Sequence, residues 1–438
     1  MNIEKIFYII LSTVLITIFI LFTFIFSPNS FNSSSPAKEK TIYFVDHISS
    51  AHQKVIDLFN KKNKGFINVE TIDLSFEKFS TNERKELLAR YLRSKNNRID
   101  VFSVDQIWVP RFTRWCVSLN SFIDSSIVNS ILPNTLKTCY YQDSLVAVPL
   151  YIDISVMFYR DDLLRKLSDY SQVVKSLDKS ITWEDFIKLS KKFNSKINPF
   201  YIFQADDYEG LICSFTELMA NQSTQFIDKN GNISLDTPEG KRSLQLLVDL
   251  VNKYDVSPKN VAYLKENESF RLFAKNNGVF IRSWPSMIDD ENEYLNDEER
   301  TNLRMVPMPH LKGTKPALVY GGWNLMISKY SNQIPEVIKF VKFLLSEESQ
   351  KIMYTEGGYL PINRNLYTDS NFIKINPLLK FYEGLYKTGV NRPFLENYTN
   401  VSDILSYYIN KAIKKEISVK DALKEATIKI NSKSILVK

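Results

Sequence analysis

Hydrophobic and polar positions in the first part of the folded region alternate in the manner of an α/β protein. Apolar runs at residues 41–45, 66–72 and 100–105 predict strands, because they are short and rich in β-branched and aromatic side chains. Between them, residues 54–60 and 80–94 carry apolar positions at helical spacing. This order of strand, helix, strand, helix and strand predicts a parallel sheet with helices on its faces.

The rest of the chain continues in the same style and contains clear helix starts. Ser80 and Glu83 form a capping-box pattern, and Thr182 precedes a helix as its cap. Pro238 stands near the first position of a further helix, where its missing N–H is not needed. We expect further extended segments at residues 145–159, 278–282, 303–307 and 317–327, and helices at residues 335–345 and 402–431.

The N-terminal region has a different pattern, because residues 6–26 are apolar or Ser/Thr and carry no charge. At about 1.5 Å per residue, this stretch is long enough to cross a bilayer core of about 30 Å. It is longer than the apolar part of a typical signal peptide, and residues 34–37 make a poor cleavage site. We therefore predict an uncleaved signal anchor at residues 1–27 and a flexible linker at residues 28–40, with a cleaved signal as the alternative.

Size and composition favour a two-lobed globular protein after this region. The 438 residues are too many for one compact core, and a charged fraction of 24% is ordinary for a folded protein. The net charge of +7 comes from interspersed acids and bases, which argues against a nucleic-acid partner. With 3 histidines, 3 cysteines and no CxxC motif, a metal site has little to build on. Cys116 and Cys139 either pair after export or remain buried thiols.

The candidate chemistry indicates binding rather than catalysis. The chain has no G-x-S-x-G elbow, no Walker loop and no G-x-G-x-x-G motif. Two of its many carboxylates would suffice for a glycosidase, but no pair stands out. Carboxylates, aromatic residues, glycines and an arginine are instead scattered around predicted strands. Sugar recognition needs this mixture, since the apolar faces of a sugar stack on aromatic rings and its hydroxyls bind charged groups.

Each of these positions has two interpretations. Asp105 ends an apolar strand and is either a helix cap or a ligand contact. Tyr151 and Asp153 face the same side of a strand, and Asp is disfavoured in strands, which favours a function. Trp284 follows a strand and is either a core residue or a stacking platform. The paired glycines at residues 321–322 indicate either a close approach of another group or a β-bulge.

From about residue 41 to the C-terminus the chain resembles the bacterial and archaeal extracellular solute-binding proteins of the maltose-binding type. Among these it is most similar to the trehalose/maltose-binding branch. Each matching segment is short, but all of them occur in the order and spacing of the family. The segments are DVFSVD (100–105) with Trp108, AVPLYID (147–153), FYRDDLL (158–164), FQ (203–204), YEGL (208–211), RSWP (282–285), GGWNLMISKYS (321–331), FLLSEESQ (343–350) and GYLP (358–361).

This resemblance implies a fold and a division of the chain. The fold would be the two-lobed periplasmic-binding-protein fold of type II, an α/β fold with a ligand cleft between its lobes, preceded here by the N-terminal transmembrane helix. Lobe I would comprise residues 41–149 and 302–346. Lobe II would comprise residues 150–301 and 347–438.

The resemblance also implies roles for single residues. Arg84 and Asp105 would bind sugar hydroxyls from lobe I, and Tyr151 and Asp153 would lie at the first crossing between the lobes. The other ligand-binding positions would be two stacking platforms, two backbone contacts and one arginine that closes over the sugar: Trp284 and Trp323, Gly321 and Gly322, and Arg392. The sequence departs from the family pattern at residues 46–50, where no acid can be aligned, and at Ser286, where an aromatic residue often stands.

The implied function is that of the extracytoplasmic sugar-binding component of an ABC transporter, which closes on a disaccharide or short oligosaccharide of the trehalose or maltose type. We expect no catalytic residue, no metal and no cofactor. The expected partners are the sugar and membrane permease subunits, with a monomeric chain held in the cell membrane and its binding domain outside the cytoplasm. The alternatives are a membrane-anchored sugar sensor, a surface glycosidase, and the same fold with a non-sugar ligand.

Overall fold

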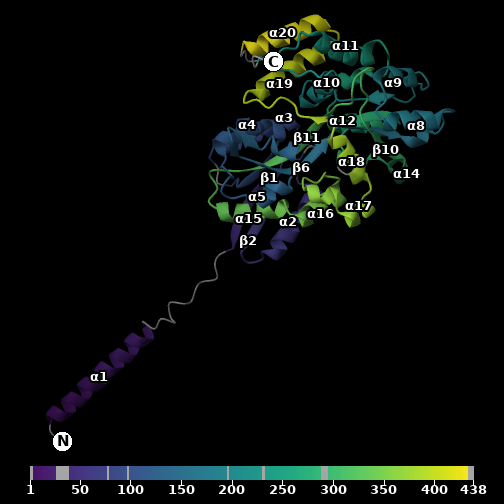
Figure 1. The fold of residues 1–438 in the computed structure, drawn as a ribbon. Helices are drawn as coiled ribbons and strands as arrows, with labels where there is room; N and C mark the ends of the chain where they lie inside the picture. The colour runs from purple at the N-terminus through teal and green to yellow at the C-terminus, as the bar shows by residue number, and fades with distance from the viewer. Residues whose placement is uncertain are drawn as a thin grey trace.

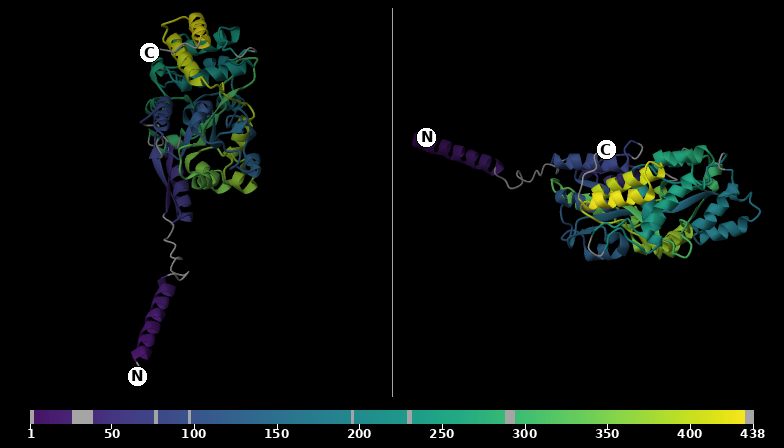
Figure 2. Two further views of the ribbon diagram at one scale, coloured as in Figure 1. Left: turned by 90° about the vertical axis from the view of Figure 1, so that its left-hand side faces the viewer. Right: turned by 90° about the horizontal axis from the view of Figure 1, so that it is seen from above.

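The computed structural model describes residues 3–25, 39–75, 78–95, 98–194, 197–228, 232–287 and 294–432. Helix α1 (Ile3–Ile25) stands apart from the folded part, which is elongated and holds one main β-sheet in each half (Figure 1, Figure 2). We call these parts the large-sheet half and the small-sheet half.

Six strands form the large sheet: β1 (Lys40–Asp46), β2 (Ile67–Asp73), β3 (Val101–Asp105), β6 (Val148–Ile154), β11 (Leu318–Ile327) and β12 (Gly389–Val390). Their order is β12-β11-β3-β1-β2, and β6 pairs with β11 as well. β1 runs parallel to β2 and β3, which confirms the parallel pairing predicted for the first three strands. β11 runs antiparallel to β3 and β6.

Helices cover the large sheet, and one of them begins at the cap that the sequence predicts. The first two are α2 (Ser50–Lys62) and α3 (Thr81–Arg93). Ser80 caps α3, and the Glu83 carboxylate accepts from the Ser80 N–H at 2.7 Å, which confirms the capping box. Between β3 and β6 lie η2 (Gln106–Trp108), α4 (Val109–Phe112), η3 (Thr113–Trp115), α5 (Ser125–Ser130), α6 (Pro133–Leu136), β4 (Tyr140–Tyr141) and β5 (Ser144–Leu145).

A further set of helices lies between β11 and β12 in the sequence. They are α15 (Ile334–Leu344), α16 (Glu347–Gly357), η6 (Arg364–Tyr367), α17 (Ser370–Ile375) and α18 (Leu378–Tyr386). Phe340 of α15 packs against Phe44 of β1 and Phe59 of α2, with ring centroids 5.6 Å and 5.0 Å away. Part of the core of this half therefore lies between β1 and the layer formed by α2 and α15.

Four strands form the small sheet: β7 (Val156–Arg160), β8 (Tyr201–Ile202), β9 (Phe280–Ser283) and β10 (Leu303–Val306), in the order β10-β7-β9-β8. β7 is antiparallel to β9 and β10, and β8 is parallel to β9. Thr182 caps the third helix of this half, as predicted. The helices are α7 (Asp161–Leu164), α8 (Tyr170–Asp178), α9 (Trp183–Ser190), α10 (Glu209–Asn221), α11 (Pro238–Asn252), η4 (Lys259–Tyr263), α12 (Glu266–Lys275), α14 (Asp297–Thr301), α19 (Tyr398–Ile413) and α20 (Val419–Asn431).

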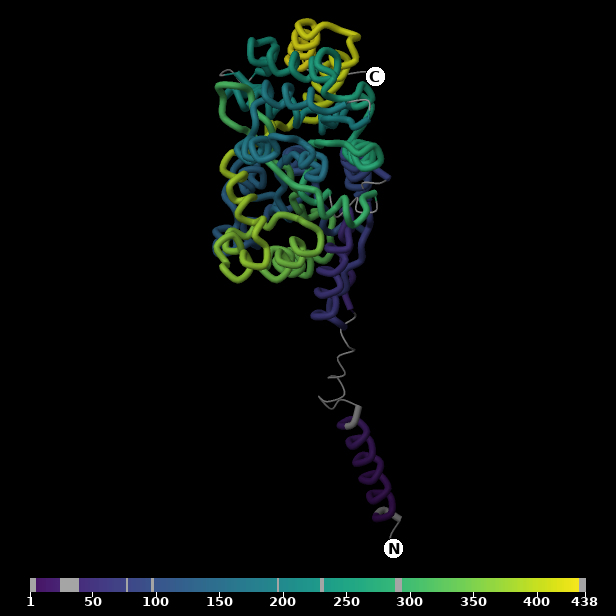
Figure 3. The backbone as a smooth tube through the Cα atoms, turned by 90° about the vertical axis from the view of Figure 1, so that its right-hand side faces the viewer, coloured from purple at the N-terminus to yellow at the C-terminus, as the bar shows by residue number. Residues whose placement is uncertain are grey.

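The chain passes between the two sheets at three places. β6 continues almost directly into β7, and Ser155 between them donates from its N–H to Val319 at 3.1 Å. Residues 307–317 lead back from β10 to β11, and residues 391–397 lead from β12 to α19. Strands or short connections, rather than one long linker, therefore join the two halves (Figure 3).

Several segments lie in a different half from the lobe to which the resemblance assigns them. The division of the chain into lobes I and II is otherwise still a prediction. β10 belongs to the small sheet, because it pairs with β7 from Leu303 opposite Arg160 to Val306 opposite Met157. α16 packs against α2 of the large-sheet half, and β12 pairs with β11. These pairings are long-range, so the local sequence pattern carries no sign of them. The predicted helix at residues 402–431 is also two helices, because Ser418 caps α20 as a separate element.

Helix α1 matches the apolar N-terminal stretch. Residues Lys5–Thr23 have a mean hydropathy of 2.6 and none of this window is buried, so the helix is long and apolar enough to cross a membrane. A signal sequence passes the same test, and the choice between an anchor and a cleaved signal stays a prediction. Residues 26–38, which include most of the predicted linker, lie outside the described residues.

Candidate ligand-binding cleft

A cavity of about 260 Å³ lies between the two halves and is lined by side chains of both. Every predicted site residue except Arg84 lines this cavity. From the large-sheet half come Asp105, Tyr151, Asp153, Gly321, Gly322 and Trp323. Trp284 follows β9 of the small sheet, and Arg392 lies in the third crossing. Positions that are far apart in the sequence thus meet around one space.

Strand pairing brings the large-sheet residues together. Trp323 of β11 stands opposite Asp105 of β3 on one side and opposite Tyr151 of β6 on the other. Gly321 stands opposite Asp153 in the same register. Residues paired across antiparallel strands lie about 4.5–5.5 Å apart, so three strands together form one wall of the cavity.

The paired glycines allow close packing within this wall. Gly322 has a φ of +125°, and a Cβ there would lie 2.7 Å from the backbone oxygen of Tyr151. A Cβ on Gly321 would lie 3.0 Å from the ring of Trp284, so glycine lets this indole approach β11. The register between β11 and β6 also shifts just after the pair, between Trp323 and Asn324. Both interpretations of the glycines, close approach and a local irregularity, therefore hold.

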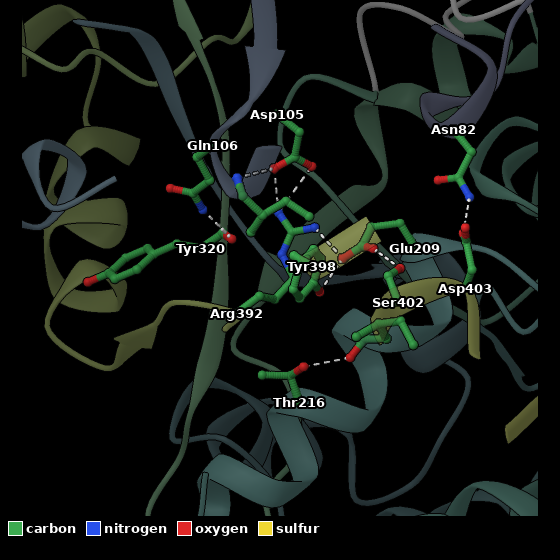
Figure 4. A network of polar contacts seen from close by, with 12 residues as sticks. Asn82, Asp105, Gln106, Glu209, Thr216, Tyr320, Arg392, Tyr398, Ser402 and Asp403 are labelled. Atoms are coloured by element: carbon green, nitrogen blue, oxygen red, sulfur yellow. Dashed lines mark hydrogen bonds and ion pairs between the residues drawn. The ribbon is translucent and has the colours of Figure 1, made fainter. Parts of the chain in front are cut away.

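Arg392 connects the two halves at the cavity. Its Nη2 donates to both carboxylate oxygens of Asp105, at 2.8 Å and 3.1 Å, and its Nη1 donates to Glu209 Oε1 at 2.7 Å (Figure 4). Asp105 ends β3 of the large sheet, whereas Glu209 begins α10 of the small-sheet half. Asp105 also accepts from the Ile107 N–H at 3.2 Å, so it is a cap and part of the cavity wall at once.

Glu209 is the most deeply held acid of this network. It is 3% exposed and also accepts from Tyr398 Oη at 2.7 Å and from the Ser402 hydroxyl. Burial raises the pKa of Glu209, and the neighbouring Arg392 opposes this rise. Burial disfavours the charge of Arg392, but Asp105 and Glu209 outweigh burial and hold the pKa of Arg392 well above its ordinary value. The network therefore keeps the arginine charged.

Arg84 lies behind the cavity wall rather than in it. The residue is 3% exposed, its Nη2 donates to Asp46 Oδ1 at 2.9 Å, and its guanidinium lies 4.1 Å from the centre of the Trp323 ring. Arg84 does not line the cavity, and its direct contact with a ligand stays a prediction. Asp46 ends β1, in the region where no acid could be aligned, and it too is buried. The next residue, His47, lines the cavity.

Several lining residues were missed by the sequence analysis. They include Glu209 and Cys213 of α10, the start of α12 from Lys265 to Glu268, Arg271, and Tyr359. Charged residues at a helix start usually face solvent, so the pattern gave no reason to single them out. Glu209 lies within YEGL (208–211), one of the segments that resemble the family, and this was the one available signal.

The cysteines and acids offer no metal centre in the part of the chain that the structure describes. No group of three or more His, Cys, Asp or Glu side chains there is placed to hold a metal ion. Cys116 and Cys139 are both free thiols, as is Cys213. Burial raises the pKa of Cys213 to about 12, so its thiol is protonated at neutral pH.

Two α/β halves joined by three chain crossings, with a polar and aromatic cavity between them, define a two-lobed solute-binding protein. Residues 44–351 match the model of the bacterial extracellular solute-binding proteins, and the chain belongs to this family. The match confirms the family resemblance and the fold class that the sequence predicts. In this family the proteins bind substrates and are not enzymes.

Relatives and solved structures agree with this assignment. A probable ABC transporter-binding protein of Deinococcus radiodurans is 26% identical over 351 residues, which cover 78% of this chain and 81% of that protein. The arabinooligosaccharide-binding protein of Bacillus subtilis is 20% identical over 275 residues, which cover 60% of this chain and 61% of that protein. The structure of maltose-bound MalE3 of T. maritima has a TM-score of 0.79 at 27% identity and covers 89% of this chain and 98% of its own.

Proposed function

We propose that this chain is the extracytoplasmic sugar-binding component of an ABC importer. Its ligand is a disaccharide or short oligosaccharide of the trehalose or maltose type, bound by closure of the two halves. The observation that carries the proposal is the cavity itself, where Trp284 and Trp323 from different halves lie together with the carboxylates of Asp105 and Asp153.

The chemistry of the cavity suits a sugar of this size. Two indole rings offer two faces on which the apolar sides of pyranose rings stack. Asp153, Glu266 and Glu268 add hydrogen-bond acceptors for hydroxyl groups, and Lys265 and Arg271 add donors. The cavity volume of about 260 Å³ lies just below the usual range for ligand pockets, about 300–1,000 Å³, which favours a short ligand over a long chain.

Closure follows from contacts to both halves. A ligand that touches Trp323 of the large-sheet half and Trp284 of the small-sheet half stabilises the state in which these rings face one space. The three crossings are the natural hinge, since they are where the chain passes between the sheets. The printed name of the Deinococcus relative, a probable ABC transporter-binding protein, supports delivery to a permease.

Two of the cavity carboxylates, Asp105 and Glu209, fit binding better than hydrolysis. A glycosidase needs one acid free to donate a proton and one base or nucleophile free to act on the sugar. Asp105 and Glu209 are instead both engaged by the same Arg392 guanidinium. An intact sugar is therefore the expected outcome of binding. Helix α1 supports a position at the membrane, where an uncleaved anchor would serve a carrier or a sensor alike.

A thermal-shift screen of the full-length chain in detergent against common mono- and disaccharides tests this proposal. A sugar at about a hundred times its dissociation constant should stabilise the folded state by about 2.7 kcal/mol. Chromatography after a long incubation should recover the same sugar intact. A screen in which no sugar shifts the transition, or in which the sugar is hydrolysed, would contradict the proposal.

A further inference from the structure

Both cavity tryptophans have a buried arginine against the ring. The Arg84 guanidinium lies 4.1 Å from the ring centre of Trp323, and the Arg282 guanidinium lies 4.8 Å from that of Trp284. The two arginines are 3% and 0% exposed, and neither lines the cavity that the two indoles line. The two halves thus present the same arrangement, an indole at the cavity and an arginine behind it.

In the large-sheet half, a carboxylate at the end of β1 holds the arginine. Arg84 donates to Asp46 Oδ1 at 2.9 Å. Asp46 is 2% exposed, and the same oxygen accepts from the His47 N–H at 2.7 Å and from the Ser103 hydroxyl of β3. The guanidinium is therefore fixed to the strands β1 and β3, and it contacts Trp323 of the neighbouring strand β11 from this position.

In the small-sheet half, the arginine is held by a helix. Arg282 of β9 donates from Nη2 to Glu217 Oε1 of α10 at 2.7 Å and from Nε to the same carboxylate at 3.2 Å and 3.3 Å. Its Nη1 donates to Gln204 Oε1 at 3.2 Å. Glu217 is 6% exposed and does not line the cavity. Trp284 lies two residues after Arg282, just past the end of β9, and is half-buried.

We propose that Arg84 and Arg282 are positioning residues, each of which fixes one cavity indole from behind in the orientation on which a sugar ring stacks. This role rests on the proposed function. A guanidinium is planar and stacks on an aromatic ring, and a carboxylate fixes its plane through a defined set of donors. The paired carboxylate also balances the charge, so that the arginine remains buried without an unpaired ion. The indole then loses little freedom when a ligand binds, which favours affinity.

A double-mutant cycle tests this role through the dissociation constants of maltose and trehalose, measured by calorimetry on the full-length chain. Arg84→Met should weaken binding about 10-fold, which corresponds to about 1.4 kcal/mol. In a Trp323→Ala background the same substitution should change the dissociation constant less than 2-fold. In a Trp284→Ala background it should keep its full effect. Arg282→Met should show the reverse dependence, coupled to Trp284 and independent of Trp323.

A neighbouring cation–indole pair provides the matched control. Lys85 Nζ lies 4.7 Å from the ring centre of Trp108, both residues are buried, and neither lines the cavity. Lys85→Met should leave both dissociation constants within 2-fold of the wild type. Additive effects of Arg84→Met and Trp323→Ala would overturn the proposal, because they would mean that Arg84 acts on the ligand or on the fold as a whole.

Two double variants and a spectroscopic measurement keep the proposal testable if a single variant is unstable or no sugar binds. Each double variant removes both charges of one buried pair, so that no carboxylate is left without its counterion. The two variants are Arg84→Met with Asp46→Asn and Arg282→Met with Glu217→Gln. The difference between the near-ultraviolet circular dichroism spectra of the wild type and Trp323→Phe, both without ligand, gives the signal of Trp323. The variant that combines Arg84→Met with Asp46→Asn should lose this signal. An unchanged signal would overturn the positioning role, whereas absence of sugar binding by the wild type would overturn only the proposed function.

Discussion

Replacing Arg392 by methionine should destabilise the fold in a manner that depends on pH. The guanidinium donates to two carboxylates that come from different halves, Asp105 and Glu209. Removing one member of a buried ion pair typically costs about 3–5 kcal/mol, because the partner is left charged and without its counterion. Since two carboxylates lose the same cation here, we expect the free energy of unfolding at pH 7 to fall by about 4 kcal/mol.

Glu209, which loses its counterion in Arg392→Met, determines how the loss of stability depends on pH. Burial already raises the pKa of Glu209 above its ordinary value of 4.5, and Arg392 is the main interaction that opposes this rise. A carboxyl with a raised pKa contributes stability that is complete below pH 4.5 and is lost as the pH rises through its folded pKa. The deficit of Arg392→Met should therefore be largest at pH 7 to 8 and shrink toward pH 4.5.

Urea unfolding followed by circular dichroism between pH 4.5 and pH 8 measures this deficit. Arg392→Met combined with Glu209→Gln should regain part of the stability at pH 7 and show a flatter pH profile. Arg114→Met, which removes an exposed ion pair with Glu396 at 3.5 Å, should change the stability by at most about 1 kcal/mol at any pH. Wild-type stability of Arg392→Met at pH 7, or a deficit that does not vary with pH, would refute this reasoning.

Three other changes test further parts of the structure. Gly322→Ala should lower the melting temperature in differential scanning fluorimetry, because φ of Gly322 is +125° and the new Cβ would lie 2.7 Å from the backbone oxygen of Tyr151. An unchanged melting temperature would contradict the close packing of β11 against β6 at this position. Thr182→Ala should lower the free energy of unfolding by about 1 kcal/mol in urea, since it removes the cap of α9, whereas Thr182→Ser should restore it. Cys213 should resist iodoacetamide at pH 8 in the folded chain and react in urea, because burial raises the pKa of its thiol to about 12. Mass spectrometry detects the labelling, and rapid labelling of the folded chain would contradict the burial of Cys213.

The sequence predicts those parts of the fold that depend on neighbours along the chain. The first three strands, the capping box of Ser80 and Glu83 and the cap at Thr182 were all recognisable, because each depends on a few adjacent residues. The placement of β10 was not, since its pairing with β7 joins residues more than a hundred positions apart. The break before α20 was hidden because the apolar spacing of the preceding helix resumes after Ser418.

The candidate site divides in the same way. Tyr151, Asp153 and Trp323 stand out locally, because polar or aromatic residues interrupt strands there. Glu209 reads as an ordinary helix start, and Tyr398 and Ser402, which bury it, lie in the last part of the chain. Arg84 contacts Trp323, which lines the cavity, but its guanidinium lies behind the indole ring and donates to Asp46. No local sequence pattern encodes this direction of the side chain.

Calorimetric titration of the best-binding disaccharide into the wild type, Trp284→Ala and Trp323→Ala tests most directly whether the two halves hold one sugar between them. We expect one sugar per chain, and a loss of affinity of at least about 10-fold in each variant, about 1.4 kcal/mol per indole. Trp183→Phe, a buried position outside the cavity, should bind as the wild type does. Wild-type affinity in either indole variant would contradict the binding of one sugar by both halves.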